Sequence, residues 1–162
     1  MYILSITLSI PKSIVEELRK KAEQAGISLE EYIVELALEG LDPVDKAIKY
    51  IEASQELLNQ ARKEFEKSNL RQASEKIWGA AALAIKAYAL FKYNKRLTSH
   101  RELWEYEEKL AKEIGEWIDD AWRHASSMHI NFYENWALKE HVERSLVKVE
   151  KLVSTVAKTI SK

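Results

Sequence analysis

The feature that most constrains the fold is a regular apolar seam near the end of the chain. Between residues 137 and 160, apolar side chains recur at alternating steps of four and three residues, at Val142, Leu146, Val149, Val153, Val156 and Ile160. This spacing places them on one stripe of an α-helix, as in helices that pack side by side. A single helix cannot bury such a stripe, so the seam predicts a bundle with further helices.

Four further helical segments precede this one. Asp42 and Pro43 form a helix start, with Asp as N-cap and Pro in the first turn, and the pattern continues to about residue 68. The next helices are expected over about 70–93 and 99–114, and one more begins near residue 116. Within 70–93, Gly79 lies among small residues, which indicates close packing by another element. We therefore expect residues 42–162 to form an up-down antiparallel bundle.

The first 41 residues follow a different pattern. Residues 2–10 alternate between apolar and polar side chains, which predicts a β-strand, and two short helices are expected over about 11–24 and 28–39. A lone strand leaves its backbone unpaired, so pairing with a second chain is the economical solution. The expected fold is thus mainly α, with residues 1–41 as a short strand-helix-helix dimerisation module. The two strand faces are Leu4, Ile6, Leu8 and Ile10, and Ser5, Thr7 and Ser9.

This N-terminal pattern includes S-I-P at Ser9–Pro11 and A-E-Q-A-G-I-S-L-E-E-Y at Ala22–Tyr32. It resembles ribbon-helix-helix proteins of the Arc and MetJ repressor type. The resemblance implies a homodimer, and in repressors of that type the strands read DNA. Here the outward strand face is uncharged, and residues 1–40 hold four basic against seven acidic residues. Dimerisation is therefore favoured over DNA reading.

Composition narrows the function classes. The 162 residues are 46% hydrophobic and 31% charged, with net charge −1 and no cysteine. Thiolate chemistry and Cys-ligated zinc are excluded, and the four scattered histidines form no HExxH pair, so we expect neither a metal site nor a cofactor. No apolar run is long enough to span a bilayer, and no signal peptide is recognised, so a cytoplasmic protein without membrane contact is expected.

The segment Trp122–Trp136 gathers the residues best suited to chemistry. Arg123 is followed directly by His124, and His129 lies six positions beyond Arg123. An imidazole that titrates near neutral pH can move a proton, and a guanidinium can bind a phosphate. Asn131 and Tyr133 are close enough in sequence to His129 to orient it or to bind a phosphate. A structural alternative is that Arg123 pairs with Asp119 or Asp120, one turn earlier in the helix.

Four parts follow one another along the chain: I-K-A-Y-A at Ile85–Ala89, T-S-H-R-E-L at Thr98–Leu103, an Arg–His helix and a final amphipathic helix. This order resembles the HEPN domain. More narrowly it resembles the archaeal PaREP family of small bundle proteins. The HEPN resemblance implies a homodimer that binds RNA or nucleotide. Many HEPN proteins are metal-independent ribonucleases, so the resemblance also suggests an antitoxin as a partner.

On this resemblance Arg123 and His129 would be catalytic, and His124, Asn131 and Tyr133 would contact RNA or nucleotide. Whether the chain is an enzyme stays open at this point. The alternatives are a ribbon-helix-helix DNA-binding regulator with a helical partner-binding domain, and a non-catalytic oligomeric scaffold.

Overall fold

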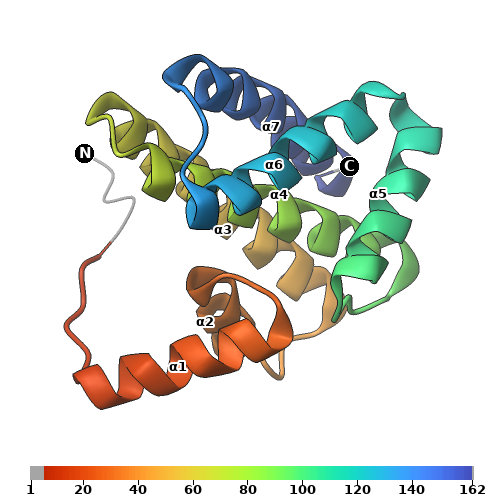
Figure 1. The fold of residues 1–162 in the computed structure, drawn as a ribbon. Coiled ribbons are helices and arrows are strands. Elements are labelled where there is room, and N and C mark those ends of the chain that lie inside the picture. The colour runs from red at the N-terminus through yellow and green to blue at the C-terminus, as the bar shows by residue number, and fades with distance from the viewer. Residues whose placement is uncertain (1–5, 162) are drawn as a thin grey trace.

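The computed structural model describes residues 6–161, and this part of the chain is helical throughout apart from its first residues and its turns. The predicted helical bundle is consistent with this structure (Figure 1). Seven helices are formed within the described residues: α1 (Lys12–Ala25), α2 (Leu29–Ala37), α3 (Pro43–Glu66), α4 (Leu70–Tyr93), α5 (His100–Ile114), α6 (Trp117–Glu134) and α7 (Lys139–Ile160).

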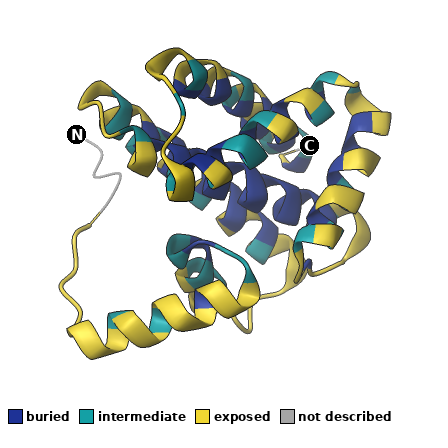
Figure 2. Ribbon diagram, in the orientation of Figure 1, coloured by how far each residue is buried: buried dark blue, intermediate teal, exposed yellow. Residues whose placement is uncertain are grey.

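Helix α4 is the centre of the molecule. It packs against α3, α5, α6 and α7, and its alanines let these neighbours approach closely. Figure 2 shows the middle of α4 buried on every side, whereas its two ends and the outer faces of the surrounding helices are exposed. No helix within residues 6–161 is both long enough and apolar enough to cross a membrane.

The seam predicted in the last helix lies where the pattern indicates. All six of its apolar residues in α7 are buried, and α7 packs along α3, α4 and α6. The start of α3 also follows its sequence signal, because the Asp42 carboxylate accepts hydrogen bonds from the backbone N–H of Val44 and Asp45. Local capping and helical periodicity together therefore position the bundle.

Helices α1 and α2 form a hairpin that docks on α4 through α2, below the bundle in the view of Figure 1. The Lys86 ammonium of α4 lies 2.8 Å from a Glu31 carboxylate oxygen and 2.5 Å from one of Glu35. Ser28, which caps α2, packs beside Gly79, and this explains the small residue expected there. By contrast, α1 has a single buried residue, Ala22.

The strand predicted for residues 2–10 is wrong for the part that the structure describes. Residues 6–10 have no regular secondary structure, and Ile6 and Leu8 remain 86% and 76% exposed. Leu4 and Ser5 lie outside the described residues. A strand gains stability only from a paired backbone, and Pro11 ends this segment before it meets another element. The strand-helix-helix module, and with it the ribbon that would enter a DNA groove, is thus replaced by a helical hairpin.

Candidate functional site

Arg123 lies on the outer face of α6, towards α5. Its Nε donates a hydrogen bond to a carboxylate oxygen of Asp119 at 2.8 Å, one helical turn earlier. The guanidinium also lies 5.6 Å from the centroid of the Trp104 ring. The Trp104 contact places the side chain beside α5, and two-thirds of it remains exposed. The pairing with Asp119 that the sequence offered as a structural alternative is therefore present.

His129 lies on a different face of α6, towards α4. Its Nδ1 is 3.1 Å from a carboxylate oxygen of Glu75, and its ring stacks on Trp78 with centroids 4.8 Å apart and planes inclined by 24°. Burial raises the pKa of the Glu75 carboxyl, and the hydrogen bond with His129 opposes that rise. Nε2 of His129 has no hydrogen-bond partner among residues 6–161. The carboxylate thus orients the imidazole and leaves one ring nitrogen for a ligand.

Arg123 and His129 do not meet within one chain. Six positions along a helix separate two residues by about 9 Å along the axis and about 120° around it. Their contacts agree with this separation, since Arg123 reaches α5 and His129 reaches α4. A joint site would require a second copy of the chain.

The other three predicted residues have different surroundings. Asn131 is fully buried, where its side chain donates to the Ser74 hydroxyl at 2.8 Å and accepts from the backbone N–H of Ala137 at 2.7 Å. Its amide links α4, α6 and the segment before α7, and it presents no atom to solvent. His124 faces α7, 3.2 Å from the hydroxyl of Ser145. Of the three, Tyr133 alone touches His129.

Tyr133 packs edge-on against the His129 ring, with centroids 5.5 Å apart, and most of its surface is exposed. An exposed aromatic ring beside an oriented imidazole is a surface on which a base can stack. The structure therefore brings His129 and Tyr133 together and separates them from Arg123 and His124.

Sequence reasoning missed the α4 side of this cluster. Glu75 is nearly buried in α4, and its position eleven residues before Lys86 places these two charged side chains on one face of the helix. That face carries both the His129 contact and the docked hairpin. His100 also belongs to this cluster, because its ring lies 5.7 Å from that of His129 and its Nε2 hydrogen-bonds to the carbonyl oxygen of Gly26.

A small cavity of about 140 Å³ adjoins Glu75 and Tyr133, between the N-terminal hairpin and helices α4 and α6. Its charged lining consists of Arg19, Glu23, Glu30 and Glu75. Three carboxylates against one guanidinium make this cavity suitable for a neutral or cationic group. A phosphate would therefore have to bind outside this cavity.

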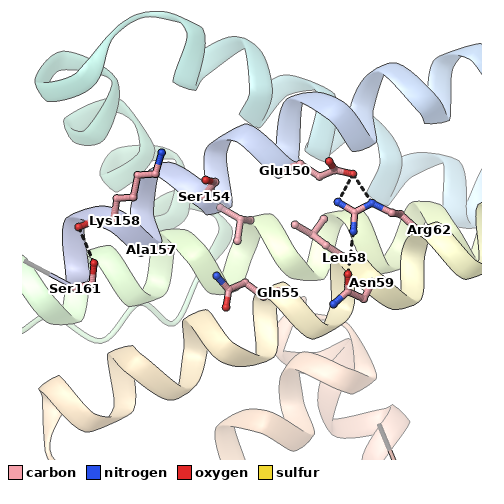
Figure 3. A pocket seen from close by; sticks show the side chains of 10 residues that line it. Gln55, Leu58, Asn59, Arg62, Glu150, Ser154, Ala157, Lys158 and Ser161 are labelled. Carbon is pink, nitrogen blue, oxygen red and sulfur yellow. Dashed lines mark hydrogen bonds and ion pairs between the residues drawn. The ribbon is translucent and has the colours of Figure 1, made fainter. Parts of the chain in front are cut away.

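A more open groove of about 500 Å³ lies between α3 and α7 (Figure 3). Arg62 spans it and is tied to Glu150 at 2.8 Å and to Asn59 at 2.9 Å. The remaining polar groups come from Gln55, Ser154, Lys158 and Ser161. The groove contains no imidazole and no predicted site residue, so it offers no comparable acid–base centre.

Comparison with known proteins places this bundle in a family. The family model of the Archaeal PaREP1/PaREP8 family matches residues 49–153, which run from α3 into α7 and include Glu75, Arg123 and His129. No curated protein and no solved structure matches the chain. The match covers well over half of the sequence, and the chain belongs to the Archaeal PaREP1/PaREP8 family.

Proposed function

We propose that the protein is a HEPN-like homodimer that binds RNA or nucleotide and cleaves RNA without a metal ion. The Glu75–His129 pair is the observation that carries this proposal. A carboxylate at 3.1 Å fixes the imidazole through Nδ1, and Nε2 has no protein partner among the described residues. Histidine in this arrangement can act as a general base or acid through Nε2. Tyr133 supplies a stacking surface beside it.

The reaction would proceed by attack of a ribose 2′-hydroxyl on the adjacent phosphorus. Nε2 of His129 accepts the hydroxyl proton as the new P–O2′ bond forms. The P–O5′ bond then breaks and the 5′-oxygen takes up a proton, which leaves a 2′,3′-cyclic phosphate and a free 5′-hydroxyl. Glu75 stabilises the imidazolium that forms transiently, because its carboxylate lies against Nδ1.

A second copy of the chain would supply the cationic part of this site. Arg123 can stabilise charge that develops on the phosphorane, but it reaches His129 only from another protomer. The N-terminal hairpin supports such a dimer, because it leaves Ile14, Ile33 and Leu36 exposed. An antitoxin partner would act by covering Nε2 of His129 or the approach past Tyr133.

Cleavage of single-stranded RNA in excess EDTA tests the proposal. His129→Ala should lower the rate by about 10²–10⁴-fold with the melting temperature little changed. Glu75→Gln should lower it less, because the amide keeps the shape but loses the charge. His141→Ala is the matched control, since it removes an imidazole that lies at the start of α7 against Leu138. Unchanged cleavage by His129→Ala would contradict the catalytic assignment.

RNA binding is tested separately from cleavage. If the wild type binds RNA without cleaving it, and Tyr133→Ala weakens binding, the chain is a binding protein and not a nuclease. If it neither binds nor cleaves RNA as a dimer, the proposal fails as a whole. A scaffold without a ligand then accounts better for the fold.

A further inference from the structure

A group of three carboxylates joins α5 to α6, away from His129. It consists of Glu107 and Glu108 of α5 and Asp119 of α6, and one oxygen from each lies within 4.8 Å of the other two. The charges are only partly balanced. Arg123 pairs with Asp119 at 2.8 Å, and Lys112 lies 3.9 Å from Glu108.

Glu107 is the unusual member of this group. Its residue is only 1% exposed, and its Oε2 is buried without a hydrogen-bond partner among residues 6–161. No ion pair reaches Glu107 within residues 6–161, and burial together with the neighbouring Asp119 carboxylate raises the pKa of Glu107 to about 8. A cation bound here would replace the proton that the two carboxyl groups otherwise share. A buried carboxylate oxygen without a partner costs free energy, so such groups are normally bonded to protein, water or a metal ion.

We propose that Glu107, Glu108 and Asp119 bind a divalent cation of the Ca²⁺ or Mn²⁺ type. Such cations prefer carboxylate oxygen ligands. Two oxygens on opposite sides of a cation lie twice the metal–oxygen distance apart, which is about 4.2 Å for Mg²⁺ and about 4.6–5.2 Å for Ca²⁺. Oxygens no more than 4.8 Å apart are therefore within reach of one Ca²⁺ ion, and a smaller cation would draw them slightly closer.

The remaining ligand positions are open to water. A depression of about 690 Å³ borders the group and is lined by Glu108, Asp119, Asp120 and Arg123 among others. Three protein carboxylates with water on the open side supply the oxygen donors that hard cations bind. The ion would connect α5 to α6 and would compete with Arg123 for Asp119. This site is separate from the Glu75–His129 pair, so its test does not depend on RNA cleavage.

The experiment titrates the full-length, EDTA-treated and dialysed protein with CaCl₂ and with MnCl₂ by calorimetry. We expect one saturable site for each chain, and a higher melting temperature when the ion is added. Glu107→Gln should weaken binding by at least about tenfold, because a charged ligand is lost. Glu108→Gln should weaken it too, and since Glu108 is half exposed this variant is expected to fold normally.

Asp120→Asn is the matched control. It removes one carboxylate from the same depression, next in sequence to Asp119, but Asp120 pairs with Lys148 and lies outside the group. Binding retained by this variant and reduced in Glu107→Gln and Glu108→Gln would support the site. Absence of saturable binding at millimolar metal would overturn the proposal, as would equal loss in all three variants, which indicates general charge attraction.

Discussion

Lys86 is the residue whose loss should affect the fold most strongly. Its side chain is 4% exposed, and its ammonium contacts Glu31 at 2.8 Å and Glu35 at 2.5 Å, whose side chains are 0% and 13% exposed. Burial lowers the pKa of Lys86, but the two carboxylates outweigh that effect, so its pKa is raised overall. Its contribution to stability is therefore present below pH 10.5 and is lost only above it, as the pH rises through the raised pKa.

Lys86→Met keeps the length of the side chain but removes the charge. Glu31 then has no cation beside it and Glu35 keeps only the half-exposed Arg96 at 3.6 Å, and breaking a buried ion pair in this way costs about 3–5 kcal/mol. For a chain of this size each kcal/mol corresponds to about 2–4 °C, so the melting temperature should fall by roughly 6–20 °C. If the hairpin undocks first, the loss appears as rapid hydrogen exchange in α1 and α2 while the bundle stays protected.

Two variants make this reasoning refutable. Lys92→Met changes the same residue type on the same helix, but the Lys92–Glu113 pair is 40% and 35% exposed, so a loss of at most about 1 kcal/mol is expected. Replacing Lys86, Glu31 and Glu35 together by Met, Leu and Leu removes all three charges and should restore most of the stability. If Lys86→Met matched Lys92→Met in urea denaturation and in hydrogen exchange, the argument from the buried pair would be wrong.

Three further outcomes follow from single contacts. Burial lowers the pKa of His124; Lys148 and Arg144 act in the same direction and Asp120 acts against it. The stability of the fold should therefore fall as the pH drops below 6.5. His124→Gln should flatten this pH dependence in thermal melts between pH 5 and 7. Gly26→Ala should cost about 1–3 kcal/mol in chemical denaturation, because φ is +71° and the new methyl would lie 3.2 Å from the His100 ring; a change below about 0.5 kcal/mol would count against this. Asn131→Ala should lower the unfolding free energy by about 1–3 kcal/mol through its lost hydrogen bonds, and a selective loss of RNA affinity with full stability would instead support the ligand-binding role.

The bundle was predictable because its signals are local and agree with one another. The seam from Val142 to Ile160 fixes the buried face of α7, and Asp42 with Pro43 fixes the start of α3. The same locality explains the error at residues 6–10. Alternation of apolar and polar residues shows that a segment can form a strand, but a strand requires a partner backbone that no pattern within those residues can supply.

The candidate site was only partly predictable, for a related reason. The sequence identified His129 and Arg123 by residue type, but proximity in sequence did not make them neighbours in space. The partner of His129 is Glu75, 54 positions away, and which residues meet across two packed helices depends on how those helices cross. Asn131 is the opposite case. It lies two positions after the candidate His129, but its side chain is buried and hydrogen-bonds to Ser74 of α4.

The central position of α4 has a consequence for how the molecule unfolds. Helices α3, α5, α6 and α7 each bury part of their surface against α4, so detaching any one of them exposes alanine-rich surface on α4 that nothing else in the described chain covers. The bundle should therefore come apart in a single cooperative transition and not helix by helix. Helix α1 stands outside this unit, because it packs mainly on α2. The chain thus combines a helical bundle that unfolds in a single step with an N-terminal helix whose detachment leaves that bundle folded.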